Sequence, residues 1–124
     1  MADPLTALLA QSRTIDAAMT RAYAELTADM NPIHLDEAFA AGTPFGGTIA
    51  HGTLTLALVW QAFEATFGPD VLRGAESEIR FSRPVPVGTR VTATGRREGE
   101  GEDWQVQVQD EAGETLLSGR VRLA

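Results

Sequence analysis

The sequence predicts an α+β domain in which an antiparallel sheet wraps around one long, apolar helix. Residues 52–67, GTLTLALVWQAFEATF, are apolar on most faces, and a helix of that kind is normally buried on several sides. From residue 76 onward, four segments have strand-like patterns and are separated by turn-rich stretches. The strands are therefore expected to form the sheet that covers the helix.

The first half of the chain predicts short helices joined by loops. A short strand is expected at 12–16, followed by a helix at 16–26 that carries apolar residues on one face. A further helix is expected to begin at Pro32, because Asn31 is a favourable N-cap and proline suits the first helical position. Gly42 then ends this helix, and a loop rich in glycine follows.

The second half of the chain predicts the strands of the sheet. The clearest alternation is WQVQVQ, in which every second residue is apolar. The turn sequences EGEGED and DEAGE join the last three strands as hairpins. The four predicted strands are 76–83, 89–97, 104–109 and 115–123.

Composition and charge limit the classes of function. The 124 residues are 44% hydrophobic and 22% charged, which is typical of one folded domain over residues 1–124. A net charge of −7 argues against nucleic acid and anionic membranes as partners. The lack of cysteine excludes disulfides, thiolate metal sites and cysteine nucleophiles, and it fits a cytoplasmic protein. No segment has the pattern of a signal peptide or of a transmembrane helix.

The segment 23–52 holds the residue types best suited to chemistry. Asp29 and His34, five positions apart, form a plausible acid/base pair. Gly52 stands at the start of the apolar helix, where a backbone N–H is free to bind a developing oxyanion. Together, these residues indicate proton transfer next to a carbonyl group.

Three segments, in order, resemble the MaoC-like (R)-specific enoyl-CoA hydratases, also called hydratase 2. They are YAELTADMNPIH (23–34), FGGTIAHG (45–52) and RFSRPVPVG (80–88). The resemblance implies a hot-dog fold, a homodimer, and syn addition of water to a trans-2-enoyl thioester, giving an (R)-3-hydroxyacyl thioester. It implies neither a metal nor an organic cofactor. The chain departs from the family in its short N-terminus and at Ala28, where the family usually has glycine. Alanine is tolerable there unless the position needs a positive φ.

The resemblance also implies roles for individual residues. Asp29 and His34 would hold and activate the water and carry the protons. We expect His34 in the first turn of the helix that begins at Pro32, where the helix dipole would favour a neutral ring. Asn31 would cap that helix and also help to orient the pair. Gly52 would supply the oxyanion-binding N–H.

Further residues are candidates for binding the substrate. Arg80 and Arg83 could bind the phosphates of coenzyme A or of an acyl-carrier phosphopantetheine, although solvated strand faces that balance nearby glutamates explain them better. Phe45 and His51 are weaker candidates. His51 is more readily explained as a packed structural histidine than as a third catalytic group, and its spacing from Asp29 and His34 is not that of a metal site.

Two alternative functions stay open at this point. A hot-dog thioesterase would hydrolyse the same class of thioester, but the Asp-x-Asn-Pro-Ile-His pattern argues against it. A non-catalytic MaoC-like subunit that only binds acyl-CoA would have no need of both Asp29 and His34. Dimerisation is expected in each case, because the sheet would otherwise leave an exposed edge.

Overall fold

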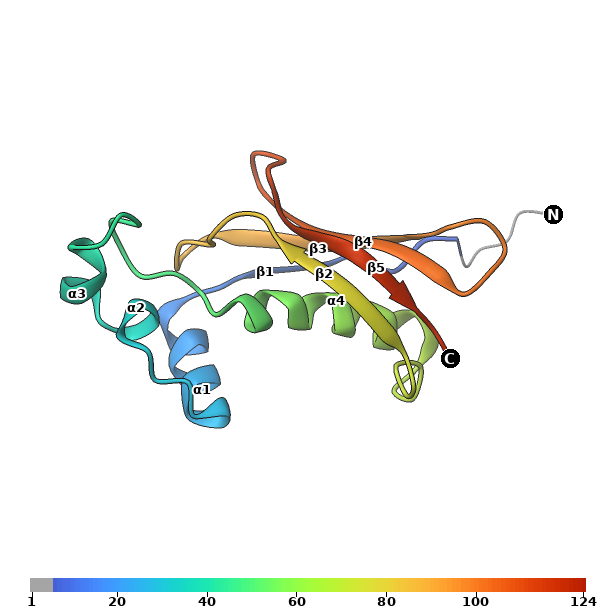
Figure 1. Ribbon diagram of the computed structural model, residues 1–124, viewed down its shortest axis with the longest axis horizontal. Coiled ribbons are helices and arrows are strands. Elements are labelled where there is room, and N and C mark those ends of the chain that lie inside the picture. The colour runs from blue at the N-terminus through green and yellow to red at the C-terminus, as the bar shows by residue number, and fades with distance from the viewer. Residues whose placement is uncertain (1–5) are drawn as a thin grey trace.

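The computed structural model describes residues 6–124, in which five strands form one antiparallel sheet and four helices are present. Helix α4 lies along one face of the sheet, and α1, α2 and α3 gather at one end of the molecule (Figure 1). The strands run in the order β1-β3-β4-β5-β2. The elements are β1 (Gln11–Thr14), α1 (Ala17–Thr27), α2 (Pro32–Leu35), α3 (Glu37–Ala41), α4 (Gly52–Phe67), β2 (Glu76–Phe81), β3 (Arg90–Arg97), β4 (Asp103–Asp110) and β5 (Thr115–Arg122).

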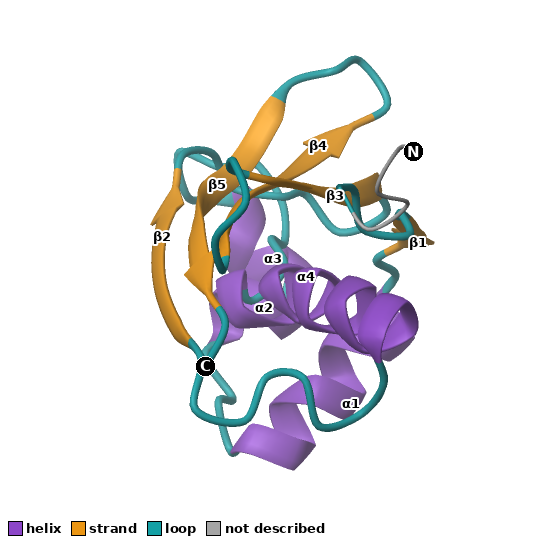
Figure 2. Cartoon of the chain, turned by 90° about the vertical axis from the view of Figure 1, so that its right-hand side faces the viewer, coloured by secondary structure: helices purple, strands orange, loops and turns teal. Residues whose placement is uncertain are grey.

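The predicted fold class is confirmed, and the core lies between α4 and the sheet. Viewed along α4, the sheet curves around the helix, with β1 at one edge and β2 at the other (Figure 2). Phe63 and Phe67 of α4 both meet the ring of Trp104 edge to face, at centroid distances of 5.8 and 5.5 Å. Full burial of a phenylalanine side chain, as at Phe63, stabilises the fold by about 1.5–3 kcal/mol. The apolar pattern of α4 is thus explained by contact with the alternating inner face of β4.

The helix predicted from Pro32 to Gly42 is wrong in one respect, because it is two helices that meet at Asp36. This residue has extended backbone angles and ends α2, while its Oδ1 accepts a hydrogen bond of 3.1 Å from the N–H of Phe39 and so caps α3. An aspartate that bonds to a neighbouring N–H favours a helix start over a helix interior. Gly42 ends α3 as predicted.

Helix α1 ends in a backbone conformation that is unfavourable for its residue. Asp16 caps its start, accepting from the N–H of Met19 at 2.9 Å. Ala28 follows its end in the left-handed region, with φ 60° and ψ 23°, and is the one non-glycine residue with positive φ among residues 6–124. The position where the family usually has glycine therefore does require a positive φ, and alanine is strained there.

The strands of the sheet lie close to their predicted positions in the sequence. Each predicted strand is present within two residues of its expected bounds. Strand β2 pairs with β5 on one side only, so its other side is open. Within residues 6–124, every helix is too short or too polar to cross a membrane.

Candidate active site

His34 is held by the segment that leads into α4. Asn31 caps α2 by accepting from the N–H of Ile33 at 3.1 Å, which fixes the turn that carries His34. The N–H of Ile49 donates to the carbonyl of Ile33 at 3.1 Å, and the Ile49 carbonyl lies 2.7 Å from His34 Nδ1. Because a carbonyl oxygen only accepts, Nδ1 of the neutral ring carries the proton. The lone pair is therefore on Nε2, where it can accept a proton.

Helix α2 does not supply the predicted reason for a neutral His34. Helix α2 has only four residues, and His34 lies in its last turn as well as in its first. A helix of one turn has no extended macrodipole, so the dipole argument fails. The tautomer is set instead by the backbone carbonyl of Ile49.

Asp29 and His34, the predicted pair, come together in the structure. One carboxylate oxygen of Asp29 and one ring nitrogen each of His34 and His51 all lie within 4.8 Å of one another. The Asp29 carboxylate is exposed, and the N–H of Asn31 approaches its Oδ1 at 3.4 Å. A water that forms hydrogen bonds of about 2.8 Å can bridge two atoms up to about 5.6 Å apart. The pair is thus spaced to hold one water between them.

His51 is buried behind this pair, with 2% of its surface exposed. Its Nε2 lies 3.1 Å from the backbone carbonyl of Asp29, so Nε2 carries the proton of the neutral ring. Its ring stacks on that of His34 at a centroid distance of 3.9 Å and a plane angle of 27°, while Tyr23 meets it edge on at 5.0 Å. His51 does not line the cavity described below, and its contact with substrate stays a prediction.

The spacing of Asp29, His34 and His51 in the sequence does not predict that all three come together. Because each residue type can bind a metal ion, the cluster has to be compared with a metal site. His34 Nδ1 and His51 Nε2 both face carbonyl oxygens. The lone pairs of two stacked rings lie in nearly parallel planes, so they do not point at one ion about 2 Å away. His51 Nδ1 is also buried, and none of the described residues forms a hydrogen bond with it. The cluster is better arranged for proton transfer than for tetrahedral metal binding.

A cavity of about 330 Å³ opens beside His34. Gly52, the first residue of α4, lines it, and the N–H of Gly52 has no hydrogen-bond partner among the described residues. A Cβ at this position would lie 3.0 Å from Cε1 of Phe81, so glycine permits the aromatic ring to pack closely. The lining residues are His34, Phe45, Ile49, Ala50, Gly52, Thr55, Phe81, Ser82, Arg83, Pro84, Val85 and Leu117.

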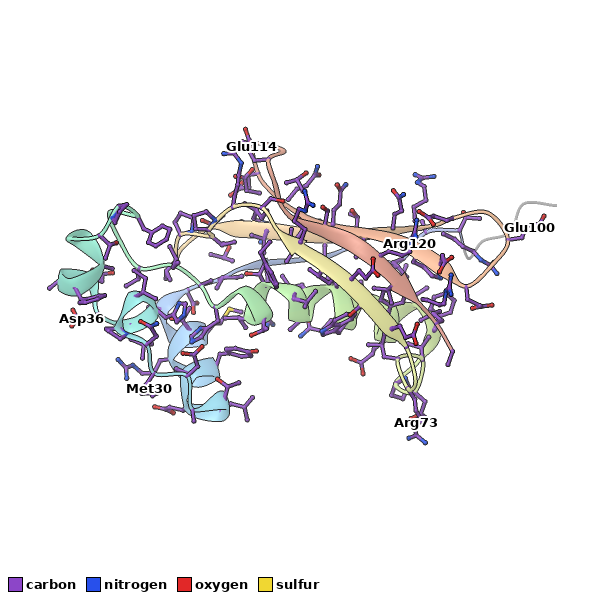
Figure 3. All side chains as sticks on the ribbon, viewed as in Figure 1. Met30, Asp36, Arg73, Glu100, Glu114 and Arg120 are labelled. Atoms are coloured by element: carbon purple, nitrogen blue, oxygen red, sulfur yellow. The ribbon has the colours of Figure 1, made fainter. Side chains whose placement is uncertain are left out.

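The two predicted arginines have different places. Arg83 lines the cavity. Its guanidinium also lies 3.4 Å from the carboxylate of Glu114, which is not a lining residue. Figure 3 places Glu114 at the tip of the β4–β5 hairpin, away from the end of the molecule that carries Met30 and Asp36. Arg80 is exposed on the face of β2 opposite Phe81, and it does not line the cavity. Phe45 does line it, with about half of its surface exposed.

Sequence reasoning did not identify Ile49 and Phe81 as parts of the site. Ile49 acts through its backbone carbonyl, which no side-chain pattern reveals. Phe81 belongs to the third segment of the resemblance, and its place on the inner face of β2 follows from strand alternation, but its contact with Gly52 is tertiary.

The residues whose pKa values are shifted lie away from this site. The Arg122 guanidinium donates to Asp103 at 2.8 and 3.1 Å and holds the pKa of that carboxyl below its ordinary value. Both residues are next to the β3–β4 turn that carries Glu100, at the end of the sheet opposite α2 and α3 (Figure 3). This ion pair therefore belongs to the sheet surface and not to the site.

Comparison with known proteins relates most of the chain to one family. The family model described as "MaoC like domain" matches residues 4–119. The chain is 40% identical over 85 residues to 3-hydroxyacyl-thioester dehydratase Z of Mycobacterium tuberculosis, covering 65% of this chain and 56% of that protein. It is 41% identical over 87 residues to the (R)-specific enoyl-CoA hydratase of Aeromonas caviae, covering 66% and 61%.

Solved structures extend the similarity over almost the full length. The (R)-hydratase from A. caviae involved in PHA biosynthesis superimposes with a TM-score of 0.81 at 28% identity, covering 99% of this chain and 100% of that one. R-hydratase PhaJ1 from Pseudomonas aeruginosa gives a TM-score of 0.80 at 26% identity, covering 93% and 77%. The chain spans a little over half of the length of the curated relatives named above.

Proposed function

Since this chain belongs to the family of MaoC-like domains and has a hot-dog fold, we propose that it hydrates trans-2-enoyl thioesters reversibly to (R)-3-hydroxyacyl thioesters. The family contains hydratases and dehydratases of this kind, among them the (R)-specific enoyl-CoA hydratases. The observation that carries the proposal is the approach of Asp29 to His34, which lines a cavity together with Gly52.

The proposed chemistry begins with a water held between the Asp29 carboxylate and His34 Nε2. As the water oxygen bonds to C3 of the enoyl group, one of its protons passes to this pair. The pair then returns a proton to C2, so the atoms of one water are added across the double bond. Syn addition delivers oxygen and proton to the same face, and one cluster on that side can therefore serve both steps.

Charge develops on the thioester oxygen as C3 is attacked. Among the described residues the N–H of Gly52 at the start of α4 has no partner, and it is suited to donate a hydrogen bond to that oxygen, because helix N-termini offer free donors. Loss of one such donor typically costs about 3 kcal/mol of transition-state stabilisation. We assign the oxyanion site to Gly52, and to Asn31 a supporting role through the turn that it caps.

The substrate carrier and the assembly are part of the proposal. We propose coenzyme A or an acyl-carrier protein as the thiol component, with Arg83 at the mouth of the cavity as the phosphate contact.

We also propose that residues 1–124 act as one domain in a cytoplasmic homodimer. Strand β2, which is paired on one side only, is available to a second copy.

The test follows two signals from crotonyl-CoA, which are the enoyl absorbance and the free thiol. We expect enoyl loss without thiol release, and a rate lowered about 10²-fold or more in Asp29→Asn. Asp70→Asn is the matched control, because Asp70 pairs only with the exposed Arg73 in the loop after α4. Thiol release would instead indicate a thioesterase. Binding of enoyl-CoA without turnover would indicate a non-catalytic subunit.

A further inference from the structure

We propose that His51 is a positioning residue, which fixes Asp29 and His34 relative to each other and to the start of α4. This inference rests on the proposed function. It also makes a geometric claim that can be tested without activity. His51 itself is buried and is not exposed to the cavity, so any effect on the reaction must act through its neighbours.

The first contact is with Asp29. The Nε2–H of His51 donates to the backbone carbonyl of Asp29 at 3.1 Å, and the histidine itself is buried. The carboxylate side of Asp29 has only the longer approach from the Asn31 N–H, at 3.4 Å. Asp29 also follows the strained Ala28. The hydrogen bond from His51 therefore ties the Asp29 backbone to a buried residue of the protein.

The second contact is with His34. The hydrogen bond between His34 Nδ1 and the Ile49 carbonyl sets the direction of one ring nitrogen, but it permits the ring to turn about the line joining the two atoms. Stacking against His51, at 3.9 Å and 27°, restricts that rotation. Together, the two contacts determine where the Nε2 lone pair points.

His51 is in turn held by the scaffold. Tyr23 meets its ring edge on, and the Tyr23 hydroxyl is 2.6 Å from Thr53 Oγ1 in the first turn of α4. The carbonyl of His51 accepts from the N–H groups of Leu54 and Thr55 at 3.1 and 3.3 Å, so His51 is also the N-cap of α4. The residue that contacts Asp29 and His34 thus directly precedes Gly52.

The chemistry of the residue also supports a positioning role. His51 Nδ1 is a buried acceptor that has no hydrogen-bond partner within residues 6–124, which is unfavourable for stability. A phenylalanine would stack on His34 without that penalty, but it has no N–H for the Asp29 carbonyl. A glutamine would supply the N–H but no ring. Only a side chain that is both flat and a donor makes the two contacts at once.

The experiment compares His51→Phe and His51→Gln in the full chain, with crotonyl-CoA as substrate. Each variant retains one contact and loses the other. We expect kcat to fall by roughly 10²-fold in each folded variant with KM nearly unchanged, because misplaced reacting groups lower the rate and not ground-state binding. In a His34→Ala background, His51→Phe should lower the residual rate much less. A kcat within about threefold of wild type in either folded variant would overturn the proposal.

Histidine tautomers give a readout that needs neither activity nor a stable variant. Long-range ¹H–¹⁵N correlation spectra of the wild-type protein are expected to show His34 protonated on Nδ1 and His51 on Nε2. The opposite tautomer on either ring would refute the geometry on which the proposal depends. If the wild-type protein hydrates no enoyl thioester but shows these tautomers, the proposed function fails while the positioning contacts stand.

Discussion

Replacing Ala28 by glycine is expected to stabilise the protein. Ala28 is exposed and lies at φ 60°, so the substitution removes a backbone penalty and changes little packing. An L-residue other than glycine loses about 1–2 kcal/mol in this region. Glycine forfeits about 0.4–1 kcal/mol through the greater freedom of its unfolded chain. At the midpoints of these two ranges, the net gain in the free energy of unfolding is about 0.8 kcal/mol.

The assay is urea unfolding followed by circular dichroism, with thermal unfolding as a second measure. A gain of this size corresponds to a rise in Tm of roughly 2–5 °C for a domain of this length. Ala22→Gly is the matched control, because Ala22 is exposed in the interior of α1 and its replacement should cost about 1 kcal/mol. A loss of stability in Ala28→Gly comparable to that of the control would refute the reasoning.

Three further predictions concern the cavity and the sheet. Gly52→Ala keeps the backbone N–H but adds a Cβ that lies 3.0 Å from an aromatic carbon of Phe81, and the resulting displacement should lower kcat/KM by about 10²-fold in a folded protein. Unchanged kinetics would show that the reaction does not need the close packing that glycine permits here. Arg83→Gln should raise KM for a coenzyme A thioester about tenfold, and less at high salt, while Arg80→Gln should not change it. Asp103→Asn should lower Tm at neutral pH, because Arg122 lowers the pKa of this carboxyl in the folded state. The difference in Tm between the two proteins should be full above the ordinary pKa of 3.8 and vanish as the pH falls through the lower folded value; a constant difference would contradict it.

Much of the fold follows from local patterns in the sequence. Helix α4 was predictable because its apolar residues cover most faces, and β4 because its residues alternate strictly. The break at Asp36 was missed, since an aspartate inside a helical pattern signals a new start only when its side chain turns back to cap it. The pattern of apolar residues does not show in which direction the Asp36 side chain points.

The site was less predictable than the fold. Asp29 and His34 could be paired from their motif, but the tautomer of His34 depends on the carbonyl of Ile49, which is a tertiary contact. The two arginines show a related limit. Alternation along β2 puts Arg80 on the outer face, whereas Arg83 follows the end of the strand and is free of that alternation. Because Arg80 and Arg83 are close in the sequence, their positions alone did not show which of them lines the cavity.

The most direct test of the central claim is hydration of crotonyl-CoA by the wild-type protein in D₂O, with the product examined by NMR and chiral analysis. We expect a single 3-hydroxybutyryl-CoA, of R configuration at C3, with one deuterium at C2 placed by syn addition. A product with S configuration, deuterium on the opposite face, or release of free coenzyme A without a hydroxylated product would contradict the account.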